Sequence, residues 1–231
     1  MQAFQRYFVS FVPGFRRSPA AIVFALNLAV LVTASLGSPL LRATNADNAG
    51  ADGEYEWQLK LSEQNVKTSV RKRADTALLE ARHVAETSAG LDQVLAQLGD
   101  GTSCITWMQR CKSAKIIKRE DENSFLGYVV LNMPWPISNR DLVYRSSRSR
   151  GADNSVVIEQ RAAPDDHPAG KLVRMISNNR FELTALDSGG TRISWRVFSD
   201  PRGNVSANMI NGRMYKETRD DMFRLLKQLG D

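Results

Sequence analysis

The order of the periodic segments is the feature of this sequence that most constrains its fold. Runs in which apolar and polar residues alternate predict half-buried strands, and apolar residues three and four apart predict helices. The alternating runs are residues 55–61, 66–73, 77–86, 114–118, 125–133, 142–147, 155–161, 171–176, 181–186 and 191–199. Helical spacing is found at 90–99 and 205–229, and the Ala- and Leu-rich run at 77–86 also allows a helix. Turn-forming residues such as Asn178-Asn179 separate most of the strands.

The long terminal helix is expected to cover the apolar face of the sheet. A meander of antiparallel strands has one apolar face that the chain's own helices must bury, and only the helix at 205–229 is long enough. Asn204 is expected to be its N-cap and Gly230 its stop. Its apolar stripe consists of Met222, Leu225, Leu226 and Leu229. The sequence therefore predicts an α+β fold in which a curved antiparallel β-sheet wraps around a long C-terminal α-helix.

The first 36 residues carry the pattern of an export signal. Arg16 and Arg17 end a stretch without acidic residues, and residues 20–36 follow without a charge. A basic flank and an apolar run are typical of a secretory signal peptide, here with a cleavage site after Ala34. The run also reaches the lower end of the ~17–25 residues that span a bilayer, so an uncleaved inner-membrane anchor is the alternative. Both interpretations place the domain outside a bacterial inner membrane, and we expect an exported, periplasmic protein.

Composition favours one globular domain behind this segment. Residues 37–53 are small and polar without periodicity, which is typical of a linker, so we expect the folded domain at 54–231. Hydrophobic residues make up 42% of the chain, enough to build a core. The formal charge is +6, but three of the positive charges lie in residues 1–37. The remaining +3 is an ordinary surface, and we expect no nucleic-acid partner.

The patterns of common catalytic and metal sites are missing from the sequence. His83 and His167 are the two histidines and lie far apart, and neither a Gly-x-Ser-x-Gly elbow nor a phosphate-binding loop occurs. We therefore predict no catalytic residue, no metal and no cofactor. The basic clusters at 71–73 and 145–150 are interpreted as solvated strand faces, with weak attraction to an anionic membrane as the alternative. The pair Asp220-Asp221 is interpreted as solvated charge.

Cys104 and Cys111 are the two cysteines, and their pairing is left open by the sequence. An exported protein can hold a disulfide. On one continuous helix their Cα atoms would lie ~10 Å apart, beyond bridging distance, whereas a loop would allow the bond.

Trp135 stands between two prolines, Pro134 and Pro136. The motif predicts a rigid turn. Its Trp either packs on the rim of the core or acts as an aromatic gate beside a pocket.

Four segments of the sequence resemble the START (StAR-related lipid transfer) family. They are Trp107–Lys115, Pro134–Asp141, Val173–Met175 and Asp200–Gly203, and the similarity extends over residues 54–230. The segment from Pro134 to Asp141 is the most specific element, followed by the Asp-Pro-x-Gly motif at 200–203. The resemblance implies a helix-grip fold, in which the curved sheet and the C-terminal helix enclose a hydrophobic cavity for one lipid. This agrees with the element order that periodicity alone predicts.

The resemblance also implies a non-catalytic function. A monomer would take a lipid or another hydrophobic molecule from a membrane surface, shield it, and transfer or sense it. The residues expected at the cavity or its gate are Trp107, Tyr128, Val130, Met133, Trp135, Arg145, Trp195, Val197, Met209 and Met214. The motif residues expected to be structural are Arg140, Asp141, Asp200, Pro201 and Gly203, the first two as a charge pair at a loop–strand junction. The methionines would also suit an ordinary helix–sheet core.

One departure from the family concerns the headgroup. Phosphatidylcholine-binding members carry an Arg three residues before the position of Trp107 and an Asp directly after it. This chain has Cys104 and Met108 there, so the resemblance does not extend to that site.

Two other functions remain as alternatives. Relatives of this fold include polyketide cyclases and hydratases, which position acid–base groups around an apolar substrate. The groups available here for such chemistry are Arg140, Arg174, Glu182 and Tyr128. The other alternative is a sensing module, in which a bound lipid alters docking to a partner.

Overall fold

The computed structural model describes residues 55–151, 153 and 155–231. Its elements in chain order are β1 (Gln58–Glu63), β2 (Val66–Arg73), β3 (Thr76–Thr87), α1 (Leu91–Gly99), α2 (Cys104–Trp107), β4 (Cys111–Arg119), β5 (Ser124–Leu131), β6 (Arg140–Arg150), β7 (Val156–Ala162), the 3₁₀ turn η1 (Pro164–Asp166), β8 (Val173–Arg174), β9 (Ile176–Ala185), β10 (Thr191–Asp200) and α3 (Ala207–Leu229). The predicted signal or anchor at 1–36 and the linker at 37–53 lie outside the described residues. Within the described part, no helix combines the length and apolar character needed to cross a bilayer.

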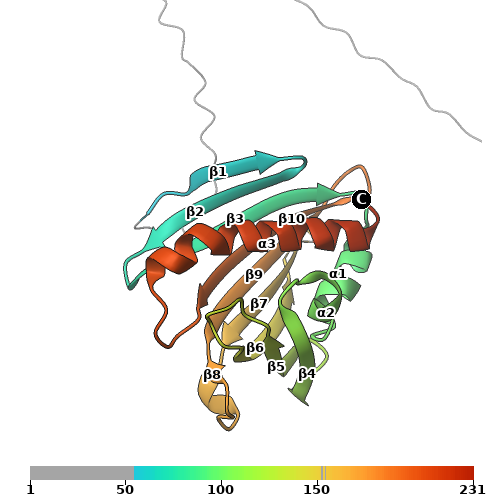
Figure 1. The fold of residues 1–231 in the computed structure, drawn as a ribbon. Helices are drawn as coiled ribbons and strands as arrows, with labels where there is room; N and C mark the ends of the chain where they lie inside the picture. The colour runs from blue at the N-terminus through green and yellow to red at the C-terminus, as the bar shows by residue number, and fades with distance from the viewer. Residues whose placement is uncertain (1–54, 152, 154) are drawn as a thin grey trace, which may run out of the picture. The chain divides into compact units, whose positions relative to one another are not determined.

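All the strands belong to one sheet. Its order is β1-β2-β3-β10-β9-β7-β6-β5-β4, with antiparallel neighbours throughout, and the short β8 pairs in parallel with β6. The sheet curves, and α3 lies across its inner face (Figure 1). Strand β10 joins the two halves, because Trp195 lies opposite His83 of β3 on one side and Phe181 of β9 on the other. The predicted α+β architecture, a curved antiparallel sheet around a C-terminal helix, is confirmed.

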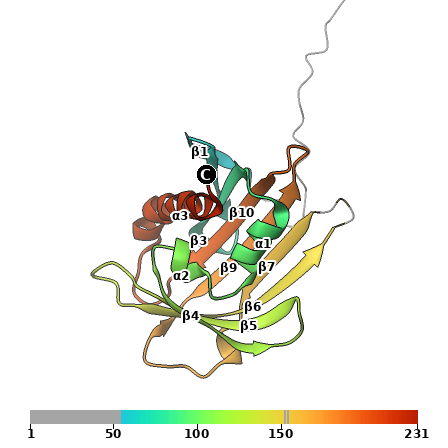
Figure 2. The same ribbon diagram turned by 90° about the vertical axis from the view of Figure 1, so that its right-hand side faces the viewer.

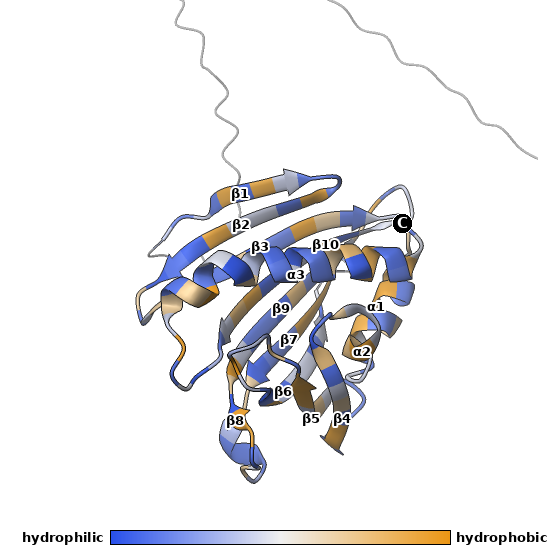
Figure 3. Cartoon of the chain, viewed as in Figure 1, coloured by the Kyte–Doolittle hydropathy of each residue, from blue (hydrophilic) through white to orange (hydrophobic). Residues whose placement is uncertain are grey.

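Helix α3 is amphipathic, as its spacing predicts. Its buried residues are Met214, Asp221, Met222, Leu225, Leu226 and Leu229. The surface that α3 turns outward is mostly hydrophilic, and apolar bands alternate along the strands behind it (Figure 3). The view along the helix shows α1 and α2 beside it on the same side of the sheet (Figure 2). The helix thus buries one stripe and leaves the rest in water.

The two ends of α3 show where local sequence predicts well and where it does not. Gly230 ends the helix as predicted, with a left-handed φ of 103° and its N–H directed at the carbonyls of Leu226 and Lys227. The N-cap is Ser206 and not Asn204. Ser206 makes no side-chain capping hydrogen bond, so packing against the sheet decides where the helix begins.

Two segments between β7 and β10 differ from the prediction. Asn178 and Asn179 were expected to form a turn but lie inside β9, where their side chains accept hydrogen bonds from Ala162 N (2.9 Å) and Trp195 Nε1 (3.1 Å). The strand expected at 171–176 is reduced to the two residues of β8. Ladder pairing decides both outcomes, because β10 pairs with Asn178 and Asn179, whereas β8 pairs with β6 through Val173 and Arg174 alone.

Two apolar clusters form the core. The larger cluster lies between α1, α3 and the strands β2, β3, β7, β9 and β10. The smaller cluster is built mainly from β4, β5 and β6, with Met175. Met108 packs against both clusters from the turn after α2. The space between the clusters is incompletely filled, and the candidate site is found there.

Candidate functional site

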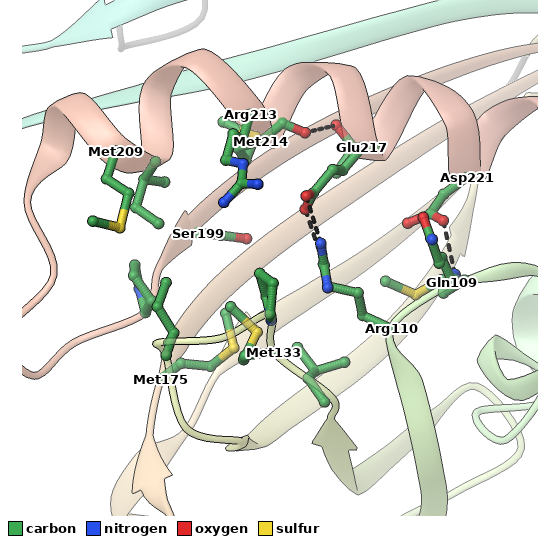
Figure 4. A pocket seen from close by; sticks show the side chains of 17 residues that line it. Gln109, Arg110, Met133, Met175, Ser199, Met209, Arg213, Met214, Glu217 and Asp221 are labelled. Carbon is green, nitrogen blue, oxygen red and sulfur yellow. Dashed lines mark hydrogen bonds and ion pairs between the residues drawn. The ribbon is translucent and has the colours of Figure 1, made fainter.

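Two adjoining hollows lie between α3 and the sheet. The first, here called the outer hollow, contains about 840 Å³ of empty space, counting the part open to solvent. Helix α3 supplies Met209, Arg213 and Met214 from one side, and Met133 and Met175 face them from the other (Figure 4). Flexible methionine side chains on opposite walls can adjust to ligands of different shape.

The second hollow, here called the inner hollow, lies against the strands and contains about 740 Å³ by the same measure. Trp107, Phe181 and Trp195 line one part of it, and Tyr144 and Val129 another. The residues that line both hollows are Met108, Leu131, Met175, Ser199 and Thr218. Because five residues are shared, the two hollows are neighbours and can serve one elongated ligand.

An aromatic cluster forms the wall of the inner hollow. Phe181 and Trp195 stack with ring centroids 5.4 Å apart, and Trp107 meets Trp195 edge to face at 5.6 Å. Such pairs are stabilising beyond the apolar area that they bury. This wall thus consists of interlocking rings, whereas flexible methionines line the outer hollow.

Charged contacts tie α3 to the segment between α2 and β4 at the rim of the outer hollow. Arg110 forms a two-point ion pair with Glu217, with N–O distances of 2.5 and 2.9 Å, and this carboxylate raises the pKa of Arg110. One turn further along α3, the Asp221 carboxylate accepts a hydrogen bond from Gln109 N at 2.8 Å. Both contacts are drawn in Figure 4. They hold the second half of α3 over the sheet.

Asp221 is buried, although the sequence suggested a solvated charge. Only 5% of the residue is exposed, and burial raises its pKa to about 6, against the opposing hydrogen bond from Gln109 and the charge of Arg224. The nearby Glu217 raises it further. The position is predictable from the sequence in one respect, since Asp221 lies four residues before Leu225 on the buried stripe.

A second buried polar group, His83, fastens the middle of α3 to the sheet. Its ring nitrogens lie 3.0 Å from Thr68 Oγ1 and 2.7 Å from Thr218 Oγ1. Thr218 also donates to the carbonyl of Met214 (2.9 Å), so it accepts from His83 Nε2–H. Burial, followed by the charge of Arg219, lowers the pKa of His83 to about 3, which keeps the ring neutral at ordinary pH.

The structure places six of the residues expected at the cavity on its walls. Trp107, Trp195 and Val197 line the inner hollow, and Met133, Met209 and Met214 line the outer one. They come from α2, β10, α3 and the loop after β5, which are brought together only by the tertiary fold.

Tyr128 and Val130 lie on the opposite face of the sheet and line neither hollow. Side chains alternate along a strand, and in β5 it is Val129 and Leu131 that face inward. Tyr128 and Val130 were expected to face inward, but they are the residues of β5 that face outward. Tyr128 instead packs against the ring of His167, with centroids 5.6 Å apart.

Arg145 also points away from the hollows. It forms ion pairs with Glu120 and with Asp166 (2.7 Å) on the outer face of β6, while its neighbour Tyr144 faces the inner hollow. The alternation of β6 again decides the outcome, so the expected inward turn of Arg145 is wrong.

Trp135 is neither on the rim of the core nor a wall of a hollow. The residue is 91% exposed, whereas Pro134 and Ile137 on either side of it line the outer hollow. The prolines fix a turn that presents the indole to solvent beside the outer hollow. A single sequence does not reveal which way such a side chain points.

The family motif residues occupy structural positions. Arg140 is buried and donates to the carbonyls of Pro201 (2.7 Å), Ser138 (2.6 Å) and Arg202 (3.3 Å), which fixes the loop before α3. Gly203 adopts a left-handed φ of 69° beside this guanidinium. Asp200 accepts a hydrogen bond from Arg202 N at 2.8 Å. These contacts give the Asp-Pro-x-Gly pattern a structural role, and Pro201 also lines the outer hollow.

Arg140 and Asp141 do not form the charge pair that the sequence suggested. Asp141, whose side chain is 1% exposed, pairs instead with Arg174, at distances of 2.8 and 3.2 Å. Arg174 also donates to the carbonyls of Pro164, His167 and Pro168. Adjacent residues of a strand face opposite sides of the sheet, so Asp141 and Arg140 meet different partners.

Cys104 and Cys111 form a disulfide with Cα atoms 5.8 Å apart. The bond connects the start of α2 with the start of β4, because α2 ends at Trp107 and the chain turns back. Among the described residues, no group of three His, Cys, Asp or Glu side chains is arranged to hold a metal ion. None of Arg140, Arg174, Glu182 and Tyr128 lines either hollow.

Comparisons with known proteins agree with this geometry. The sequence matches the START domain family over residues 44–230. It is 24% identical over 188 residues to an uncharacterized protein of Pseudomonas aeruginosa, covering 80% of this chain and 88% of that protein. It is also 27% identical over 111 residues to the phosphatidylcholine transfer protein of Mus musculus, covering 46% of this chain and 51% of that protein.

Solved structures show the same fold. A fragment of a STAR-related lipid transfer protein from Xanthomonas axonopodis superposes with a TM-score of 0.70 at 24% identity, covering 76% of this chain and 99% of that one. Human StAR-related lipid transfer protein 5 gives a TM-score of 0.69 at 16% identity, covering 75% and 86%. With a curved sheet gripping α3, hollows between them and a family match over most of its length, this chain belongs to the START domain family.

Proposed function

We propose that this protein binds a single lipid, or another hydrophobic molecule of similar size, in the two adjoining hollows and carries it without changing it chemically. The observation that carries the proposal is the unfilled, mainly apolar space between α3 and the sheet. Membership of a lipid-binding family supports it. Each methylene group that leaves water contributes about 0.8 kcal/mol, so an acyl chain in such a space can compete with its place in a membrane.

A carrier role is favoured over a cyclase-like enzyme by the placement of the ionisable groups. None of the side chains named for acid–base work lines either hollow. Three of the four charged side chains that line the outer hollow, Arg110, Glu217 and Asp221, are engaged in contacts that hold α3 in place. A lipid carrier needs these groups only to hold α3 in place, and it needs no acid–base catalysis from them.

To exchange a lipid with a membrane, the outer hollow must come into contact with a bilayer. We place the contact at the loop after β5, where the exposed Trp135 stands beside Pro134 and Ile137 at the outer hollow. Tryptophan favours the interface between water and lipid because it has an apolar body and one polar N–H.

We also propose that the domain is exported. The basic and apolar segment at residues 1–36 supports this, and so does the disulfide between Cys104 and Cys111, a bond that persists in oxidising compartments.

Native mass spectrometry of the full chain, purified from a bacterial host, tests lipid binding. A retained lipid of unaltered mass is the expected result. Ser199→Leu should lower the retained fraction severalfold, because Ser199 lines both hollows and a larger side chain fills them. Ser194→Leu is the matched control, since Ser194 is on the same strand but lines neither hollow. Equal occupancy in both variants, or no bound lipid in the unmodified chain, would contradict the proposal.

A further inference from the structure

The inner hollow is polar in places but has no ionisable acid or base among its lining residues other than the phenol of Tyr144. Burial raises the pKa of Tyr144 to about 12, so this phenol is neutral as well. The charges at the site, Arg110, Arg213, Glu217 and Asp221, line only the outer hollow. The chemistry of the ligand end that reaches the inner hollow must therefore suit uncharged partners.

Most hydroxyl groups of the inner hollow already donate to the backbone. Tyr144 donates to the carbonyl of Gly101 (3.2 Å), Ser103 to that of Gln97, and Thr218 to that of Met214 (2.9 Å). Ser177 and Ser199 bond to each other at 3.0 Å, which uses one of their two hydroxyl hydrogens. The nitrogen donors that are left for a ligand belong to an indole and two amides.

The first is the indole N–H of Trp107. Trp107 is 5% exposed and lines the inner hollow, and its Nε1 is buried without a hydrogen-bond partner in the part of the chain that the structure describes. Indole nitrogen can only donate, and a buried donor without an acceptor is destabilising. Trp195, in the same aromatic wall, has its own acceptor in Asn179. Among the described residues, the Trp107 N–H thus lacks a hydrogen-bond acceptor, whereas the Trp195 N–H has one.

The other two donors are the amides of Gln160 and Asn179. These residues are direct partners across β7 and β9, and both line the inner hollow. The Asn179 oxygen accepts from Trp195 Nε1 at 3.1 Å, which leaves its NH₂ group for another acceptor. No side-chain hydrogen bond joins Gln160 to another described residue. The amide pair and the Trp107 N–H together form a set of neutral donors around an apolar space.

We propose that the inner hollow binds the uncharged oxygen acceptors of a neutral lipid, the ester carbonyl or hydroxyl groups of an acylglycerol, with Trp107, Gln160 and Asn179 as donors. This rests on the proposed lipid-binding function and narrows its substrate class. Each donor gains an acceptor when such a ligand enters. A phosphate or quaternary ammonium group would lose its hydration there without meeting an opposite charge, which is far more costly than burying an ester.

A matched pair of probes tests this: 1-dodecanoylglycerol and 1-dodecanoyl-glycero-3-phosphocholine, which differ only in the phosphocholine group. Binding to the full chain is followed by displacement of the neutral dye Nile red. We expect the monoacylglycerol to bind at least tenfold more tightly. Trp107→Phe and Gln160→Met keep the ring or the side-chain volume but remove the donor, and each should weaken monoacylglycerol binding about three- to tenfold. Thermal unfolding of each variant verifies that it is folded.

Trp57→Phe is the matched control, because Trp57 lines neither hollow, and it should leave both affinities unchanged. Equal or tighter binding of the phosphocholine probe would overturn the inference, as would unchanged monoacylglycerol affinity in both donor variants or no binding of either probe. The mass spectrum separates this inference from the proposed function. A tightly retained phospholipid would contradict the preference for a neutral lipid but would still support lipid binding. An empty protein that accepts neither probe would remove both.

Discussion

At the scale of single residues, the least expected group is Asp221, a buried carboxylate on the inner side of α3. It faces Gln109 N and Arg110 from the segment before β4, and Arg224 and Glu217 on its own helix. Removal from water, together with the nearby Glu217 carboxylate, outweighs the favourable contacts with Gln109, Arg224 and Arg110, so the pKa of Asp221 rises to about 6. Asp221 lies beside the outer hollow, where its contact with Gln109 helps to position α3. Its raised pKa should be visible in the pH dependence of the free energy of unfolding.

Asp221→Asn should remove part of the pH dependence of folding. The folded pKa lies above the unfolded value near 3.8, so the native state binds the proton more tightly, and stability falls as the pH rises from about 4 through 6. The neutral amide avoids this loss and still accepts from Gln109. We expect the variant to be more stable than the parent by on the order of 2–3 kcal/mol at pH 7, with the difference vanishing below pH 4.

Urea unfolding at several pH values between 3.5 and 7.5 measures this difference. Asp220→Asn is the control, because Asp220 is partly exposed and pairs with the adjacent Arg219. If the free energy of unfolding varied with pH in the same way for the parent and for Asp221→Asn, Asp221 would not have the raised pKa that its burial implies.

At the scale of elements, α3 has two halves that are held differently. The second half is buried through Met222, Leu225, Leu226 and Leu229. The first half is attached to β3 through Asn211, which accepts from Leu79 N and donates to the carbonyl of Ala77, both at 2.9 Å. Met209 in this half is 43% exposed and lines the outer hollow. Opening for a ligand is therefore expected at the first half.

Two glycine substitutions in α3 should have opposite effects. Gly212 lies within the helix, and an added Cβ would meet no atom within 4 Å, so Gly212→Ala should stabilise the fold by about 0.5–1 kcal/mol. Gly230 has a φ of 103°, so Gly230→Ala should destabilise it by about 1 kcal/mol. Urea unfolding of both variants at pH 7 gives the two values. The same sign for both would contradict the assigned end of α3.

At the scale of the whole molecule, the leading segment and the disulfide make one joint prediction. If residues 1–36 export the domain, Cys104 and Cys111 meet an oxidising compartment and pair. In bacterial cells expressing the full chain, neither thiol should react with an alkylating agent added at lysis. A chain without residues 1–36 should stay in the reducing cytosol and react at both cysteines.

Fractionation and mass spectrometry of the alkylated protein measure both outcomes. A Cys104→Ser, Cys111→Ser variant of the full chain is the control, and it should still be found in the periplasmic or membrane fraction. Free thiols in the full chain, or the same fractionation with and without the leading segment, would refute export.

The sequence by itself determined the elements and their order. Alternation and helical spacing identify most strands and α3, and the need to bury one face of the sheet leads to a helix gripped by it. Segments such as Pro134–Asp141 and Asp200–Gly203 identify the family. These features are local, because a periodic pattern follows from the geometry of the strand or helix that carries it.

Only the tertiary structure decided which side chains reach the cavity. Val129 and Val130 are equally apolar neighbours in sequence, yet the first lines the inner hollow and the second faces outward. The burial of Asp221, the partner of Asp141 and the amide pair of Gln160 and Asn179 likewise depend on strands and helices far apart in the chain. A shift of one residue reverses every face of a strand, and the register that sets it comes from neighbouring strands and not from the strand's own sequence.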